Sequence, residues 1–265
     1  MSERYCAYCG ADGGLTREHL WPASLHRRLV KANGAPQSLF WLRRVDAEIQ
    51  GEPKIRDVCR TCNNGPLSEL DSYICTLFDR YFIRILQRNE KVKFEYDYHR
   101  LKRWLLKMSF NSARMHSSLD LFVYPSLLTY MCGSSDSAGR SVHIYLQLSY
   151  PGLVPPERLK DPDCQDAPAL WEPQDNRVGL VHFEAPGIGR KILRAVHLRS
   201  YSFFLAFFEP GTSMAAASVF TREFLARMPG TILLVASRKQ LDLVCDGADA
   251  WHSYDGAREN KFVAG

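Results

Sequence analysis

The sequence predicts an α+β protein in two parts: a cysteine-containing module over residues 1–78 and an α+β domain with mostly antiparallel strands over residues 79–265. In the first part, two C-x-x-C pairs are separated by 49 residues, and a segment with helical spacing of apolar residues follows the second pair. In the second part, several segments alternate as strands do, and there is no internal repeat. These observations together favour the α+β class.

Composition restricts the class of protein further. The chain has 265 residues, of which 46% are hydrophobic and 24% charged, as is ordinary for a soluble globular protein. No stretch approaches the roughly 18 consecutive apolar residues of a membrane span. The segment Met1–Tyr5 is polar and lacks the apolar core of a signal peptide. We therefore expect a cytoplasmic protein with no membrane partner.

The first elements surround the first cysteine pair. Residues 1–15 contain three glycines, at positions 10, 13 and 14, and predict a turn-rich knuckle. Residues 15–20 form a short extended segment, which ends where Pro22 biases the preceding residue away from helix. A short helix with a basic face is expected over residues 24–30. Residues 32–53 contain Gly, Pro and Gln, and we expect a loop with an inserted strand there.

The second cysteine pair lies where a strand gives way to a helix. Residues 55–58 predict a short strand that leads into Cys59. A helix is expected to begin near Cys62, because apolar residues then recur every three to four positions, at Leu67, Leu70, Ile74, Leu77 and Phe78. Pro66 is tolerated only in a first turn, so the helix proper should begin within a residue or two of Asn64.

A second helix is expected over residues 98–115, after a strand at 91–98. Trp104 has the spacing of a core residue, although it could also stack on a nucleic-acid base. Basic residues on this helix could then follow a phosphate backbone: His99, Arg100, Lys102, Arg103 and Lys107.

The remaining residues predict an antiparallel arrangement whose strand order the sequence does not give. Strands are expected at 141–150, 178–183, 193–198, 202–208 and 231–236. A helix is expected over 218–228, and the segment 151–176, rich in Pro and Asp, should be a surface excursion.

Four cysteines predict one structural zinc site: Cys6, Cys9, Cys59 and Cys62. In a reducing compartment paired cysteines are more often metal ligands than disulfides, and a tetrahedral zinc site needs four ligands. The second pair stands at a helix N-terminus, where the helix dipole favours thiolates. The other cysteines are expected to be small buried hydrophobes: Cys75, Cys132, Cys164 and Cys245.

Positive charge accompanies the cysteine pairs. Residues 1–110 contain 19 Lys and Arg against 13 Asp and Glu, a net +6, whereas residues 111–265 contain 15 against 16, a net −1. A positively charged module suits a polyanionic partner. Contacts with nucleic-acid phosphates are expected from Arg17, Arg27, Arg28 and Arg60.

The segment between the cysteine pairs contains a motif. Leu15–Pro22 reads LTREHLWP, with Glu18 directly before His19, and Cys62 is followed by Asn63 and Asn64. This order of C-x-x-C, Glu-His-x-x-Pro and C-x-x-C-Asn resembles the HNH endonuclease family, and VCRTCNNG over residues 58–65 resembles one bacterial branch of it. The resemblance covers residues 5–78.

The resemblance implies a ββα-metal fold with a treble-clef zinc, and metal-dependent hydrolysis of phosphodiester bonds in DNA, double-stranded in the first instance. It implies His19 as general base, and histidine suits that role because its side chain ordinarily titrates near neutrality. Glu18 and Asn63 are then the ligands of a catalytic Mg²⁺ or Mn²⁺, since both offer hard oxygen atoms. Glu18 and His19 should point to opposite sides of the strand.

The sequence departs from the family pattern in one respect. Residues 45–58 contain no asparagine, although a middle asparagine in the family orients the histidine. Asp57, a backbone carbonyl or Asn33 could take that role. Taken alone, each motif residue also has a structural explanation; Asn63, for instance, could be a helix N-cap.

Three functions remain open. The first is an HNH endonuclease that cuts or nicks DNA. The second is a zinc-stabilised adaptor that binds nucleic acid or protein without catalysis. The third is a nuclease effector of a prokaryotic defence or restriction type, in which residues 79–265 bind a regulatory ligand, a protein partner or the target sequence.

Overall fold

The computed structural model describes residues 5–34, 39–42, 47–50, 53–138, 142–160, 168–173 and 176–252. Over these residues the chain is mixed α+β, and the strand pairs described are antiparallel except for one short parallel pair, which agrees with the mostly antiparallel arrangement expected from the sequence. It divides into two compact units, one of residues 1–83 and 96–140, the other of residues 84–95 and 141–265. This division differs from a boundary after residue 78, because the helix over residues 98–116 belongs with the N-terminal residues.

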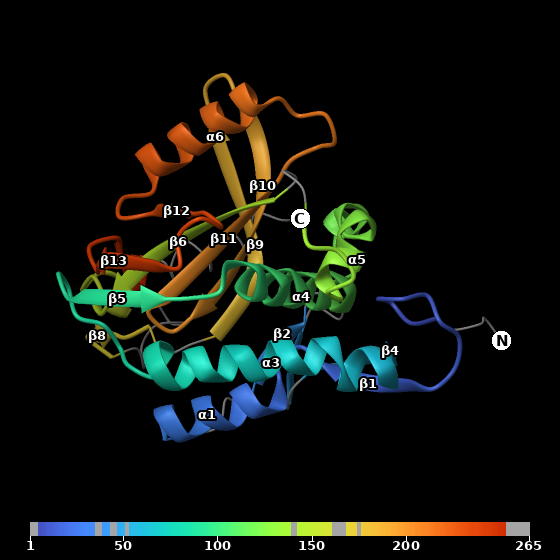
Figure 1. Ribbon diagram of the computed structural model, residues 1–265. Helices are drawn as coiled ribbons and strands as arrows, with labels where there is room; N and C mark the ends of the chain where they lie inside the picture. Colours follow the sequence, from blue (N-terminus) through green and yellow to red (C-terminus); the bar gives the residue numbers. More distant parts are fainter. Residues whose placement is uncertain are drawn as a thin grey trace. The chain divides into compact units, whose positions relative to one another are not determined.

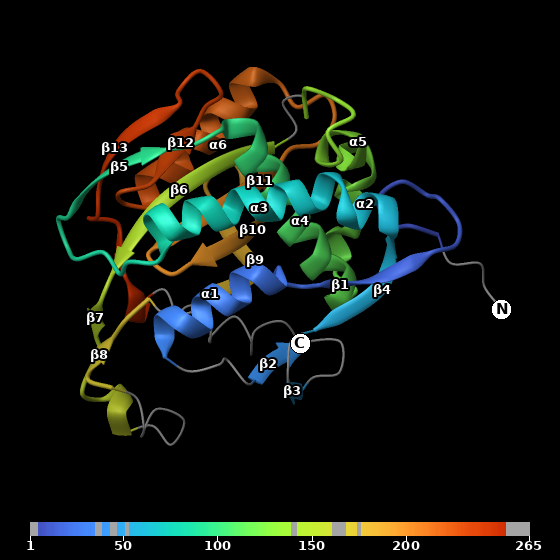
Figure 2. The ribbon, with the colours of Figure 1, turned by 60° about the horizontal axis from the view of Figure 1, so that its bottom comes forward.

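The first unit is organised around two antiparallel strands, β1 (Leu15–His19) and β4 (Lys54–Cys59), with Leu15 opposite Cys59 and His19 opposite Lys54 (Figure 2). The register shifts between Thr16 and Arg17. From Arg17 onwards, side chains then alternate between an exposed face and a buried face of the strand pair.

Two helices follow β4 where the sequence predicts one. α2 (Arg60–Asn64) ends at Gly65, and α3 (Pro66–Leu77) begins with the proline at its first position. A Cβ atom on Gly65 would lie 2.7 Å from the Thr61 carbonyl oxygen, so this close turn requires glycine. A π-helical turn, η2 (Phe78–Phe82), continues α3.

A helix and a pair of strands connect β1 to β4. α1 (Ala23–Asn33) buries Leu25 and Leu29 and ends at Gly34 in the left-handed conformation. Instead of one inserted strand, two short strands pair antiparallel, β2 (Leu39–Leu42) and β3 (Ala47–Gln50).

The long helix α4 (Tyr98–His116) confirms the expected second helix and packs against α3 (Figure 1). The Asp97 carboxylate caps it by accepting a hydrogen bond from the Arg100 backbone N–H. Trp104 is fully buried, and the centroid of its ring lies 6.2 Å from that of Trp21, so Trp104 is a core residue. Lys102 and Lys107 are also buried. The expectation that these two lysines contact a phosphate backbone is therefore wrong, because their side chains do not reach the surface. Short helices complete the unit: η3 (Leu119–Val123), η4 (Pro125–Leu127) and α5 (Leu128–Met131).

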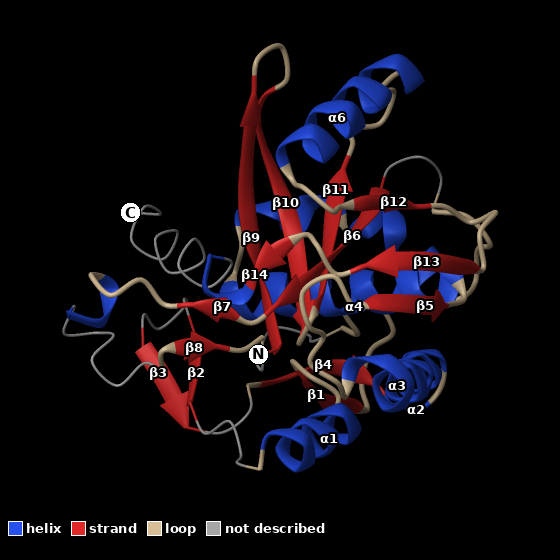
Figure 3. Cartoon of the chain, turned by 90° about the vertical axis from the view of Figure 1, so that its left-hand side faces the viewer, coloured by secondary structure: helices blue, strands red, loops and turns tan. Residues whose placement is uncertain are grey.

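The second unit contains a sheet in the order β12-β6-β11-β10-β9. Its strands are β6 (Val142–Tyr150), β9 (Asn176–Ala185), β10 (Gly189–Leu198), β11 (Tyr201–Phe207) and β12 (Ile232–Leu234). Figure 3 shows β9 and β10 running side by side as a long hairpin. The helix α6 (Met214–Arg227) packs on this sheet through Phe220 and Phe224, which join Tyr145, Phe183 and Phe204 in one buried cluster.

Smaller elements complete the second unit. β5 (Lys91–Glu95) pairs with β13 (Gln240–Val244), β7 (Gly152–Leu153) with β8 (Leu170–Trp171), and β14 (Ala248–Asp249) lies parallel to β6. The expected excursion over 151–176 also includes a 3-10 turn, η5 (Arg158–Lys160), whereas Cys164 lies outside the described residues. Among the described residues, no helix has the length and apolar character needed to cross a membrane.

Candidate functional site

The four cysteines of the two C-x-x-C pairs converge in the first unit. The sulfur atoms of Cys6, Cys9, Cys59 and Cys62 all lie within 4.8 Å of one another, and those of Cys9 and Cys59 are 3.7 Å apart. A tetrahedron with Zn–S bonds of about 2.3 Å has edges of about 3.8 Å. Within the described residues this is the one such group of potential metal ligands, and its geometry fits a zinc ion.

Local backbone geometry directs these thiols inward. The first pair lies in a tight turn, in which the Gly10 N–H donates to the Cys6 carbonyl (2.9 Å) and Gly10 has a φ of 73°. In the second pair, Cys59 is the N-cap of α2, and its sulfur accepts a hydrogen bond from the Cys62 N–H (3.4 Å). The knuckle is joined to β4 by one backbone hydrogen bond, in which the Ala7 N–H donates to the Asp57 carbonyl oxygen (2.8 Å).

The thiols differ in their affinity for protons. Burial raises the pKa of Cys6, but hydrogen bonds from backbone N–H groups, that of Cys59 first, outweigh burial and lower it to about 7. Burial also raises the pKa of Cys62, and the neighbouring thiols raise it further. Four crowded sulfurs thus cannot all be ionised without a cation, and a bound Zn²⁺ would stabilise all four thiolates.

The motif residues lie on neighbouring elements but make separate contacts. His19 ends β1 and is partly exposed. Asn63 lies within α2, where its side-chain N–H donates to the Thr16 hydroxyl (2.8 Å), which in turn donates to the Val58 carbonyl (2.8 Å). Asn63 is therefore not an N-cap, because Cys59 caps α2 and Gly65 precedes α3. Its side chain instead links α2 to β1.

Glu18 lies on the opposite side of β1 from His19, as expected, and only 5% of its surface is exposed. Its Oε1 atom lies 3.0 Å from the Lys107 ammonium of α4, which also contacts the Asp71 carboxylate at 2.6 Å. Burial by itself would lower the pKa of Lys107, but the two carboxylates outweigh burial and raise it. Lys107 is therefore a buried cation shared by two acids.

This arrangement does not fit an open site for a divalent ion on Glu18 and Asn63. The Glu18 Oε1 atom accepts from Lys107 and, at 3.3 Å, from the Asn111 amide. Asn63 is bound to Thr16 instead of sharing a partner with Glu18. A divalent ion on that Glu18 atom would lie close to the buried Lys107 ammonium, and the two positive charges would repel each other.

Residues of α4 that the sequence did not single out complete the buried side of β1 and β4. Asn111 contacts Tyr8, Arg114, Glu18 and the His19 backbone. Arg114 also forms an ion pair with Asp57, so the Asp57 carboxylate is directed to α4. No pattern in the sequence joins these residues to the motif, since they follow Glu18 and His19 by about 90 positions.

The exposed side of the strand pair is positively charged. From the strand register, Arg17 lies opposite Arg56 and His19 lies opposite Lys54. Arg17, Lys54 and Arg56 are exposed, and His19 is partly exposed. We refer to Arg17, His19, Lys54 and Arg56 as the basic face. Arg17 was expected at a phosphate-binding surface, whereas Lys54 and Arg56 were not singled out. Only the pairing of β1 with β4 reveals them as neighbours of His19.

The other expected phosphate contacts lie elsewhere in the first unit. Arg27 on α1 and Arg60 at the start of α2 are exposed. Arg28 forms a two-point ion pair with Asp79, at 2.7 and 2.9 Å. Its guanidinium is therefore already bound to a carboxylate.

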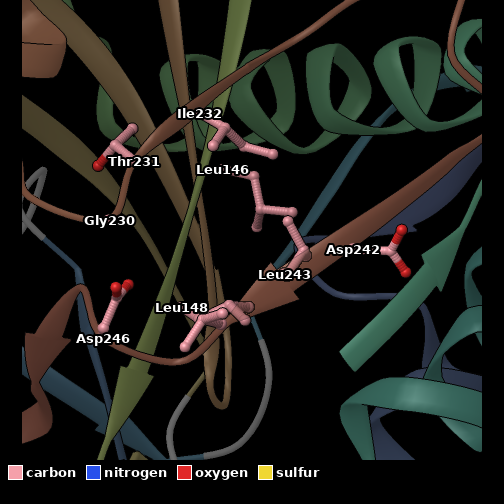
Figure 4. A pocket seen from close by; sticks show the side chains of 9 residues that line it. Leu146, Leu148, Gly230, Thr231, Ile232, Asp242, Leu243 and Asp246 are labelled. Carbon is pink, nitrogen blue, oxygen red and sulfur yellow. The ribbon is translucent and has the colours of Figure 1, made fainter. Parts of the chain in front are cut away.

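The second unit contains a separate cavity of about 220 Å³ (Figure 4). Leu146, Leu148 and Leu243 form its apolar wall, and Asp242 and Asp246 lie at its margins. It contains none of the motif residues.

No protein-family model, curated protein or solved structure matches the chain.

Proposed function

We propose that the protein is an HNH-type endonuclease that hydrolyses phosphodiester bonds in DNA. The observation that carries this proposal is the basic face, where His19 stands among Arg17, Lys54 and Arg56. The four-cysteine cluster supports it as well, because it joins the knuckle, β4 and α2 in the part of the chain that resembles this family.

The charges of the basic face suit a polyanion. Arg17 and Arg56 lie directly opposite each other, and like charges in such a cross-strand position repel. A phosphate backbone would relieve this repulsion and release its own counterions. The partly exposed His19 would then be adjacent to a bound phosphate, where its imidazole could accept a proton from the attacking water.

A nicking assay tests the proposal. Supercoiled plasmid is incubated with the zinc-loaded protein and Mg²⁺ or Mn²⁺, and the same assay is repeated with His19→Ala. His252→Ala is the matched control, since this exposed histidine belongs to the second unit. We expect wild type and His252→Ala to nick alike, and His19→Ala to lose at least about 100-fold in rate, the lower range of what general-base catalysis contributes. Absence of nicking by wild type with either metal, or equal nicking by His19→Ala, would contradict the proposal.

The second candidate is a zinc-stabilised adaptor that binds nucleic acid without cutting it. The ion pair between Glu18 and Lys107 favours the adaptor hypothesis, because Glu18 is an expected ligand of the catalytic ion and this ion pair occupies one of its oxygens. This reading predicts that Arg17→Ala with Arg56→Ala weakens DNA binding, that Asn63→Ala leaves binding unchanged, and that wild type does not cleave.

A further inference from the structure

One face of α4 contacts the buried side of β1 and β4. Lys107, Asn111 and Arg114 are spaced by four and three residues, so they project from the same side of the helix. Lys107 contacts Glu18 and Arg114 contacts Asp57, while Asn111 lies between them. The strand pair thus has a basic outer face and an acidic inner side that α4 neutralises.

Asn111 is fully buried and uses its whole hydrogen-bonding capacity. Its side-chain oxygen accepts from the Tyr8 hydroxyl (2.8 Å) and from the Arg114 guanidinium (2.5 Å). Its side-chain N–H₂ donates to Glu18 Oε1 (3.3 Å) and to the His19 carbonyl oxygen (3.2 Å). An asparagine can make these four bonds in only one orientation here, because the flipped amide would direct its donors at an arginine.

These four bonds connect three separate parts of the chain. Tyr8 belongs to the knuckle, between two cysteines of the cluster, and Arg114 is held by Asp57 of β4. The remaining two bonds go to consecutive residues of β1, the carboxylate of Glu18 and the backbone of His19. Asn111 therefore fixes the end of β1 relative to the cysteine cluster.

We propose that Asn111 is a positioning residue for His19, and that Glu18 belongs to this support instead of binding a catalytic ion. The catalytic part of the inference rests on the proposed function. Asn111 holds the His19 main chain from the buried side, so that the imidazole projects from the exposed side among the charges of the basic face. Glu18 anchors the Asn111 amide and is itself neutralised by Lys107.

The test combines a spectroscopic and a kinetic measurement on the full chain. The protein is labelled with ¹⁵N-histidine, and the ring signal of His19 is assigned from its absence in His19→Ala. Asn111→Ala removes all four bonds. Asn111→Asp keeps the shape of the side chain and an oxygen that accepts from Tyr8 and Arg114, but it removes both hydrogen bonds that Asn111 donates to β1. This second variant replaces Asn111→Ala in the experiment if the alanine variant does not fold. Ser109→Ala is the matched control, because this buried hydroxyl of α4 has no hydrogen-bond partner.

We expect Asn111→Ala and Asn111→Asp to move the His19 ring signal beyond its linewidth and Ser109→Ala to leave it in place. With zinc content and folded fraction equal to wild type, kcat for cleavage should fall about 10- to 100-fold in both Asn111 variants while KM is unchanged, as expected for a misplaced catalytic group.

An unmoved His19 signal in a folded Asn111 variant, or a kcat within twofold of wild type, would overturn the inference. The two proposals fail separately. If wild type does not cleave DNA, the proposed function fails, whereas the His19 signal still reports whether Asn111 positions the end of β1.

Discussion

At the scale of single residues, Lys102 shows what a buried charge does to stability. Its side chain is 3% exposed on α4, and its ammonium lies 5.5 Å from the ring centre of Tyr98 and 5.9 Å from that of Tyr130. Burial lowers the pKa of Lys102 from 10.5 to about 8, although the two ring faces favour the charged form. The folded state therefore holds this proton less tightly than the unfolded chain does.

This difference predicts a pH dependence of stability. Below pH 8 both the folded and the unfolded state bind the proton. The charged, buried ammonium then lowers the free energy of unfolding by roughly 3 kcal/mol, which corresponds to a pKa shift from 10.5 to about 8. Between pH 8 and 10.5 the folded protein releases the proton first, so the free energy of unfolding contributed by Lys102 rises with pH. Lys102→Met should thus stabilise the protein at pH 7, and its advantage over wild type should vanish by about pH 10.5.

The measurement is urea unfolding of wild type and Lys102→Met from pH 6.5 to 10.5. The difference between the two curves isolates this one lysine, because other titrating groups are common to both. Lys93→Met is the control, because it removes an exposed lysine of β5 and keeps the buried one. A difference that does not change with pH would refute the expected titration.

The sequence predicted those residues of the site whose signal is local. Spacing within each C-x-x-C pair located the four thiols, and strand alternation separated Glu18 from His19. Lys107 and Asn111 gave no such signal, because a polar residue on a helix looks the same whether it faces solvent or a strand about 90 positions earlier. Tertiary packing alone decided that Lys107 is an ion-pair partner and not a phosphate contact.

At the scale of elements, the cysteine cluster joins the knuckle to the end of β4 and to the short helix α2. The knuckle is attached to β4 through its backbone, and α2 is only five residues long. A helix this short is unstable by itself, so its position depends on the sulfur atoms at its start and on the Asn63–Thr16 contact. The expected order of strand, cysteine pair and helix was right, whereas the break at Gly65 was not foreseen.

Removing the metal tests the role of the cluster. We expect one zinc ion per chain, and a strong chelator or Cys62→Ser should lower Tm and increase hydrogen exchange in β1 and α2, because metal binding contributes to the folding free energy of such modules. Zinc content is measured by mass spectrometry, and exchange by the same method after proteolysis. Cys245→Ala is the control, since this buried cysteine lies in the second unit and should leave zinc content at one. Unchanged exchange in β1 after complete zinc removal would show that the cluster does not hold these elements.

At the scale of the whole molecule, one strand of the second unit comes from a segment that lies, in sequence, between the two parts of the first unit. Residues 84–95 leave the N-terminal unit to form β5, which pairs with β13, and Phe94 within it is fully buried near Tyr201. Backbone hydrogen bonds between Asn89 and Cys245 and between Cys245 and Glu90, each 2.9 Å, secure the segment. Alternation predicted this strand, but its partner lies about 150 residues away, which no local pattern could reveal.

This topology predicts how a fragment of residues 1–140 behaves. Without residues 141–265, β5 has an unpaired edge and Phe94 loses its cover, so we expect the fragment to self-associate. A matched fragment with residues 84–95 replaced by a Gly/Ser linker should be monomeric in light scattering, because it lacks that edge. A monomeric unmodified fragment, with the amides of β5 in rapid exchange, would contradict the role given to Phe94.

The linker fragment then allows a direct comparison of its nicking rate with that of the full chain. If the second unit restrains cutting, the linker fragment should nick plasmid faster than the full chain.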